Sequence, residues 1–164
     1  MKEVSEQYDI PLTGSCGCGE TRFELTDAPL FVHACHCLTC QKSSGSAFGI
    51  TTIALEQDIV TTHGTLNVVP MLDAPHRFKH VCAKCNEHIY TTATNHPATA
   101  LFRTGTLDDP REIHINAHIF TKRKQPWLTL PGDVPQFVEG YKREQTWPER
   151  SLRRLADAIA GSAG

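Results

Sequence analysis

The chain has 164 residues and a formal net charge of −2, so its length fits one domain and its charge gives no reason to expect nucleic acid or an anionic membrane as a partner. Hydrophobic residues make up 40% of the chain, enough for a core, yet no apolar run approaches the roughly 18 residues of a membrane helix. Residues 1–6 are polar and lack the apolar stretch of a signal peptide, which predicts a cytoplasmic protein with reduced thiols.

The predicted elements begin after a lead-in over 1–11 that we expect to be flexible. Glycines within 14–19 predict a tight turn around Cys16 and Cys18. Short apolar or alternating stretches follow, with almost no helical periodicity, which predicts a mainly β domain. The expected strands lie at 21–25, 47–53, 59–62, 66–69, 77–81, 89–92, 101–104 and 113–115.

The connections and the C-terminal end have their own signals. Gly64 and Thr65 predict a hairpin turn between two of the strands, and residues 41–46 are expected to form a polar loop. In the irregular segment 125–137, Trp127 and Phe137 are expected to pack on the core.

The last part of the chain predicts a helix. Thr146 and Glu149 fit a capping box, with proline in the first turn. Apolar residues then follow at helical spacing, so we expect a single C-terminal helix over about 147–160.

Seven cysteines are the strongest chemical signal in the sequence. Disulfides explain them poorly, because the count is odd, no export signal is seen and side chains two apart on an extended chain are parallel. Ligation of a soft metal explains the close spacing better. The cysteines form two pairs and a triplet: Cys16 with Cys18, Cys82 with Cys85, and Cys35, Cys37 and Cys40.

The two pairs together supply four thiolates. Four sulfurs complete a tetrahedral zinc site with no open position, which is the arrangement of a structural site. The turn after Cys85 calls for a left-handed residue, and Asn86 is the best substitute for glycine there. Spacing alone leaves open which pairs combine.

The triplet predicts a different kind of zinc site. Three thiolates leave the fourth position vacant, as in catalytic zinc sites. Because three thiolates donate much charge, the metal would activate water weakly, and it would better bind an incoming thiol and hold it as thiolate. We therefore expect thiol chemistry rather than hydrolysis.

Two alternatives remain for the triplet. A histidine could close it as a second structural site: His36 projects away from its flanking cysteines on an extended segment, whereas His33 lies on the side of Cys35 and is the better candidate. Alternatively, the triplet could bind no metal and pack as reduced thiols.

These motifs resemble the glutathione-dependent formaldehyde-activating enzyme family, which includes centromere protein V. The order and spacing of all seven thiols match, and the resemblance runs from about residue 12 to residue 138. The matching segments are 14–19, 35–45, 82–85, 103–109, 118–120 and 125–127.

The resemblance implies an Mss4-like fold, a tent of small antiparallel sheets around zinc. We accordingly expect a zinc-binding domain over 12–138 and a C-terminal extension over 139–164 that carries the helix. The resemblance also implies two zinc ions per chain, a structural one on Cys16, Cys18, Cys82 and Cys85 and a catalytic one on Cys35, Cys37 and Cys40. The implied activity is the condensation of glutathione with formaldehyde to S-(hydroxymethyl)glutathione, which is classed as a carbon–sulfur lyase reaction.

The leading hypothesis is therefore a zinc-dependent carbon–sulfur lyase that adds a small thiol, such as glutathione, to an aldehyde, such as formaldehyde. Lys42 and Ser44 are the candidate proton donors, by proximity in sequence. The alternatives are a non-enzymatic zinc scaffold and a thiol or metal sensor, whose zinc would be easily lost and whose triplet would oxidise. Exposed strand edges would allow a homodimer.

Overall fold

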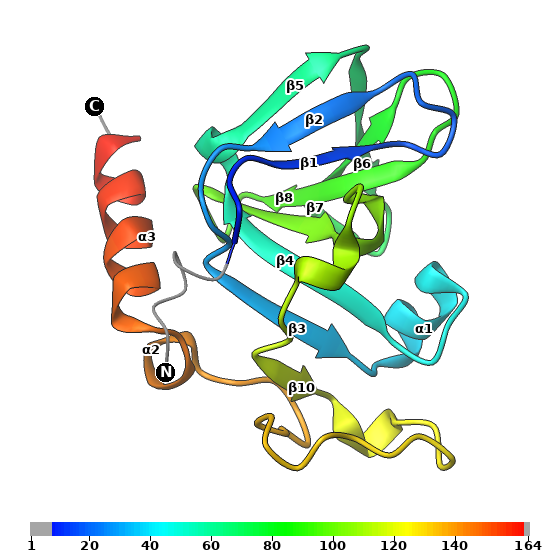
Figure 1. The fold of residues 1–164 in the computed structure, drawn as a ribbon, viewed down its shortest axis with the longest axis vertical. Helices are drawn as coiled ribbons and strands as arrows, with labels where there is room; N and C mark the ends of the chain where they lie inside the picture. Colours follow the sequence, from blue (N-terminus) through cyan, green and yellow to red (C-terminus); the bar gives the residue numbers. More distant parts are fainter. Residues whose placement is uncertain (1–7, 163–164) are drawn as a thin grey trace.

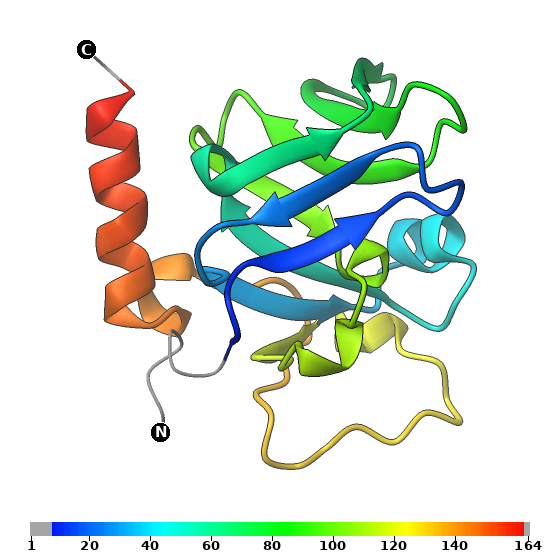
Figure 2. The ribbon, with the colours of Figure 1, turned by 45° about the horizontal axis from the view of Figure 1, so that its top comes forward.

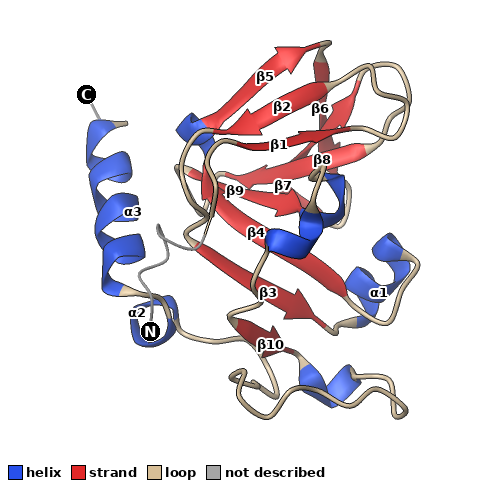
Figure 3. Ribbon diagram, in the orientation of Figure 1, coloured by secondary structure: helices blue, strands red, loops and turns tan. Residues whose placement is uncertain are grey.

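The computed structural model describes residues 8–162, which form ten strands in two sheets and a C-terminal helix (Figure 1). Strands dominate the fold (Figure 3), so the mainly β prediction is confirmed. The small sheet has the strand order β1-β2-β5, and its strands are β1 (Leu12–Ser15), β2 (Arg22–Leu25) and β5 (Ile59–His63).

The large sheet has the strand order β10-β3-β4-β9-β8-β7-β6. Its pairs are antiparallel apart from β10 with β3, which is parallel. Its strands are β3 (Phe31–Cys35), β4 (Gly49–Leu55), β6 (Leu66–Met71), β7 (Ala74–Cys82), β8 (His88–Ala93), β9 (Thr99–Arg103) and β10 (Ala117–Ile119).

The small sheet lies across one face of the large sheet (Figure 2). A first core, whose buried residues include Phe23, Ile89 and Phe102, lies between the two sheets. Strand β2 alternates exposed or half-buried residues with buried ones, because one of its faces meets this core. Phe23 of β2 packs on Phe102 of β9 with ring centroids 4.8 Å apart. The two sheets are therefore held together by apolar contact as well as by the chain that links them.

A second core lies where the C-terminal segment packs on the sheets (Figure 1). Helix α3 (Glu149–Gly161) buries Leu155 and Ala158 there, beside Phe31 and Trp147. The predicted C-terminal helix is therefore confirmed, although it begins two residues later than expected. Arg154 of α3 pairs with Asp27 at 3.0 Å and Asp58 at 2.9 Å, which ties the helix to the sheets.

The capping box predicted at Thr146 is wrong. A short helix α2 (Arg143–Thr146) ends there, Trp147 is extended, and α3 follows with Pro148 at its N-cap. The physical reason is that proline disfavours the helical conformation in the residue before it. Trp147 instead turns its buried ring into the second core.

Two other connections differ from the sequence prediction. Gly64 and Thr65 do not form a hairpin, because β5 belongs to the small sheet and β6 to the large one. The strand predicted at 113–115 is also wrong, and β10 lies at Ala117–Ile119 instead. Asn116 accounts for the shift, since its Oδ1 accepts a hydrogen bond from the Val32 amide at 2.8 Å and aligns the next residues with β3.

The remaining predictions for the segment ends are mixed. Phe137 packs against the second core as expected, but Trp127 is 72% exposed, so its predicted core contact is wrong. Of the lead-in predicted over 1–11, residues 1–7 lie outside the described residues, and Tyr8 is buried in the first core. No helix within residues 8–162 combines the length and apolar character needed to cross a membrane.

Candidate metal centres

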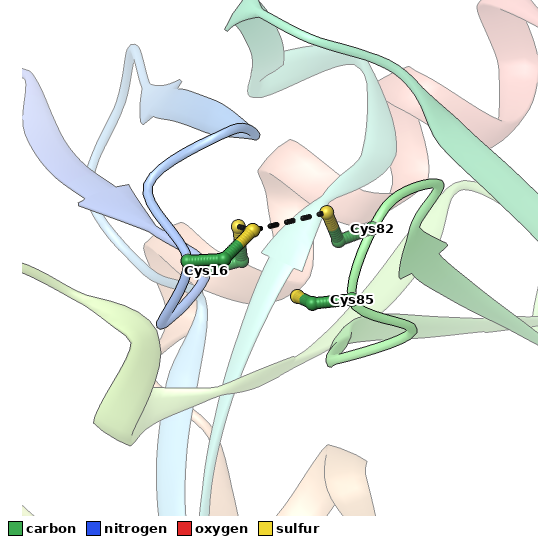
Figure 4. A group of neighbouring side chains, drawn as sticks. Cys16, Cys82 and Cys85 are labelled. Carbon is green, nitrogen blue, oxygen red and sulfur yellow. Dashed lines mark hydrogen bonds between the residues drawn. The ribbon is translucent and has the colours of Figure 1, made fainter.

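The first cysteine cluster joins two turns that are far apart in the sequence. Cys16 and Cys18 lie in the turn between β1 and β2, opposite Cys82 at the end of β7 and Cys85 in the turn that follows (Figure 4). All four sulfurs lie within 4.8 Å of one another. The sulfurs of Cys16 and Cys18 are 3.4 Å apart, and those of Cys18 and Cys82 are 4.0 Å apart. These values bracket the separation of about 3.8 Å that Zn–S bonds of about 2.3 Å give in a tetrahedron.

Both turns are shaped for ligation. The Thr21 amide donates to Cys16 Sγ at 3.3 Å, and the Cys16 amide donates to the Thr21 carbonyl at 3.0 Å. In the second turn the Asn86 amide donates to the Cys82 carbonyl at 2.9 Å. Asn86 has a φ of 61°, so the predicted left-handed residue is confirmed. A hydrogen bond from the Gly17 amide to the Glu87 carboxylate connects the two turns.

The second cluster contains Cys35, Cys37 and Cys40, whose sulfurs also lie within 4.8 Å of one another. Cys35 ends β3, Cys37 is the N-cap of helix α1 (Leu38–Ser44), and Cys40 lies in the first turn of that helix. The Cys40 amide donates to Cys37 Sγ at 3.4 Å. All seven cysteines of the chain are free thiols.

Helix α1 replaces the polar loop that the sequence predicts over 41–46. No residue of α1 is buried, so no apolar periodicity marks it. The helix is defined by its ends, with the Cys37 sulfur capping the first turn and Gly45 left-handed after the last, at a φ of 63°. The structure thus brings Cys40 back toward Cys35 by one helical turn.

No histidine, aspartate or glutamate in the described part of the chain joins these three sulfurs as a fourth ligand. His33 Nδ1 lies 3.1 Å from the Tyr141 hydroxyl, and His36 Nε2 lies 3.0 Å from His118 Nδ1. Burial lowers the pKa of His33 to about 4, so its ring is neutral at pH 7. Both candidate histidines are therefore engaged away from the triplet.

The electrostatics of the triplet favour a thiolate on Cys40. A hydrogen bond with Cys35 lowers the pKa of Cys40 to about 6, and the charges of Arg103 and Arg77 act in the same direction. The hydrogen bond with Cys40 and burial raise the pKa of Cys35 in turn. Thiolate is the form that binds metal, so the triplet is partly prepared for ligation near neutral pH.

A cavity of about 500 Å³ lies beside the triplet. Ser44, His88 and Arg103 line it together with Gly49, where a Cβ atom would lie 4.0 Å from Cys40 Sγ. Of the two predicted proton donors, Ser44 lines the cavity, whereas Lys42 is exposed on α1. The three cysteines do not line the cavity themselves, and Gly49 is the lining residue that lies against Cys40.

Sequence reasoning did not single out Arg103 and His88 as residues of this cavity. Arg103 pairs with Thr51 across β9 and β4, and its guanidinium donates to the Ser43 carbonyl at 3.2 Å. The register of the sheet creates this proximity between residues some sixty positions apart, and the motif segment 103–109, which begins with Arg103, is a signal for it in the sequence.

Comparison with known proteins places the chain in a family. The family model described as glutathione-dependent formaldehyde-activating enzyme matches residues 11–123, more than half of the chain, and the chain belongs to this family. No curated protein matches it. A solved structure from Rhodobacter sphaeroides is 17% identical, with coverage of 76% of this chain and 99% of that one; its TM-score of 0.49 is too low to carry an argument.

Proposed function

We propose that the protein is a zinc-dependent carbon–sulfur lyase that adds glutathione, or a thiol of that class, to an aldehyde such as formaldehyde. The observation that carries the proposal is the triplet of Cys35, Cys37 and Cys40, whose three sulfurs converge beside a cavity and receive no fourth ligand from residues 8–162. Membership of the formaldehyde-activating family supports the choice of substrates.

The two cysteine clusters would hold zinc in two different roles. Cys16, Cys18, Cys82 and Cys85 fit a closed tetrahedral site, which would staple the β1–β2 turn to the β7–β8 turn. Zinc held by Cys35, Cys37 and Cys40 would supply an open coordination position, which lowers the pKa of an incoming thiol.

The residues of the cavity would serve the addition itself. The thiol loses its proton, its sulfur attacks the carbonyl carbon, and a carbon–sulfur bond forms while the carbonyl electron pair moves to oxygen. Arg103 carries the positive charge that would stabilise the developing oxyanion. The proton that the thiol releases to water ends on this oxyanion, the Ser44 hydroxyl in the cavity would relay it, and the product is the hemithioacetal.

Calorimetric titration of glutathione into the zinc-loaded protein tests the proposal. We expect binding by the wild type and none by Cys40→Ser, while the matched control Ser46→Ala, an exposed residue just after the same helix and outside the cavity lining, binds normally. Retention of two zinc ions without any thiol binding by the wild type would contradict an enzyme and favour the scaffold.

A further inference from the structure

A second cavity, of about 480 Å³, lies where the C-terminal extension crosses the large sheet. Ile53 of β4 and Leu101 of β9 form its base, and Tyr141 and Trp147 form a wall. Residues 141–147 lie outside the segment 11–123 that the family model matches. The cavity therefore combines residues inside the matched segment with residues outside it.

The cavity lies on the sheet face that carries the cysteine triplet. Residues paired across strands share a face, and Phe31 pairs with Ile53, which pairs with Leu101. Because side chains alternate along a strand, Phe31, His33 and Cys35 point to this same face. The His33 ring contacts Tyr141 of the cavity wall, and Cys35 lies two residues, about 7 Å, further along β3.

The wall is held rigidly. Trp147 Nε1 donates to the Tyr141 hydroxyl at 3.1 Å, and the Trp147 ring stacks on Phe31 with centroids 5.6 Å apart. The Arg143 guanidinium lies 4.8 Å above the Trp147 ring. Its Nη2 donates to His96 Nδ1 at 3.5 Å, and a guanidinium fixed in this way on an aromatic face still has other N–H groups for a ligand.

The charge of the cavity is positive and incompletely balanced. Arg77, Lys142 and Arg143 line it, against the single carboxylate of Glu144. None of the three cations takes part in an ion pair with a carboxylate of residues 8–162. Their surplus charge and donors suit a carboxylate or phosphate group.

We propose that this cavity is a subsite for a carboxylate of the thiol substrate, held by Arg77 and Arg143 while the sulfur reaches the triplet. The inference rests on the proposed function and makes the enzyme selective for thiols with a carboxylate several bonds from sulfur. A tripeptide spans at most about 10 Å, which is longer than the roughly 7 Å along β3 from Cys35 to His33, whose ring contacts Tyr141 of the cavity wall.

The test compares five probes by calorimetry on the zinc-loaded protein: glutathione, its dialkyl ester, S-methylglutathione, 2-mercaptoethanol and inorganic phosphate. In the wild type we expect glutathione to bind at least about tenfold more tightly than its ester, as for a lost charged hydrogen bond. Arg77→Gln and Arg143→Gln should lose that preference and still bind 2-mercaptoethanol. Arg153→Gln, an exposed arginine of α3, is the matched control. If an arginine variant fails to fold, Lys142→Gln is tested in its place, because Lys142 is exposed and also lines the cavity.

The outcomes separate the two proposals. Equal affinity for glutathione and its ester, unchanged in the arginine variants, would overturn the subsite and leave the thiol site standing. Arginine-dependent binding of S-methylglutathione, with no binding of 2-mercaptoethanol, would overturn the thiol site and leave the anionic subsite. Arginine-dependent binding of inorganic phosphate in preference to S-methylglutathione would overturn the assignment of a carboxylate. Absence of binding by all these probes would overturn both proposals.

Discussion

His36 and His118 face each other in the interior, with His36 Nε2 3.0 Å from His118 Nδ1. Both rings are buried, and His36 Nδ1 has no hydrogen-bond partner among the described residues. His36 separates two cysteines of the triplet, and His118 belongs to β10, which pairs with β3. The pair therefore connects the edge of the large sheet to the segment that presents Cys35 and Cys37.

Substitution His118→Leu should weaken both the fold and the triplet. It leaves the His36 ring buried without its partner, which costs about 1–3 kcal/mol of unfolding free energy. Because His36 orients the chain between Cys35 and Cys37, zinc at the triplet should also exchange faster with a chelator. Urea unfolding and chelator kinetics measure the two effects. Wild-type values for both would contradict the proposed connection.

Substitution Arg154→Gln should destabilise the protein through α3. The Arg154 side chain is 17% exposed and pairs with Asp58, whose side chain is 12% exposed, so its loss leaves a carboxylate largely buried and unpaired. We expect a loss of about 2–4 kcal/mol in urea unfolding. Arg153→Gln on the same helix, where the side chain is 71% exposed, should change stability by less than about 0.5 kcal/mol. Equal effects of the two variants would show that Arg154 is not an anchor.

Substitution Gly64→Ala should be costly because the turn between the sheets passes close to the chain. Gly64 has a φ of 70°, and a Cβ there would lie 2.3 Å from the Glu20 carbonyl oxygen. Steric overlap with backbone and a left-handed conformation together predict a loss of about 1–3 kcal/mol. Gly105→Ala, which meets nothing within 4 Å, is the control and should be neutral or slightly stabilising. Thermal unfolding of both variants measures the difference.

The pKa of His88 predicts a pH dependence. Burial, with a smaller contribution from Arg103, lowers the pKa of His88 from 6.5 to about 4. The unfolded state therefore binds more protons between these values, so stability rises with pH up to about 6.5 and is lost as pH falls below it. Between pH 7 and pH 5.5 the wild type should lose about 1 kcal/mol more than His88→Gln. Parallel unfolding curves of the two proteins across this range would contradict the shift.

The fold class followed from the sequence because the strands carry their own signals. Alternation along β2 and the apolar runs of β4 and β9 reflect burial on one or both faces, which composition records directly. The sequence does not show in the same way which strands pair with one another. The turn at Gly64 therefore suggested a hairpin, although its real constraint is the approach of Glu20.

The candidate site, like the fold, could be predicted from the sequence only in part. The cysteine spacing predicted the two pairs, the triplet and the left-handed Asn86, because ligand spacing is a local property, whereas the combination of the two pairs into one cluster came from the family resemblance. The sequence does not predict helix α1, because the helix buries no side chain. It does not predict the two cavities either, because residues from distant strands and from the C-terminal extension line them. Pro148 by itself predicts an extended Trp147, whereas the capping-box pattern predicts a helix that starts at Thr146, and the structure follows the proline.

X-ray absorption at the zinc edge tests the central claim most directly, since it counts sulfur neighbours around both metals. With one closed and one open site, the average number of sulfur neighbours per zinc should rise from about 3.5 to about 4 when glutathione is added. An average that does not change on addition of glutathione would contradict an open position that receives the thiol.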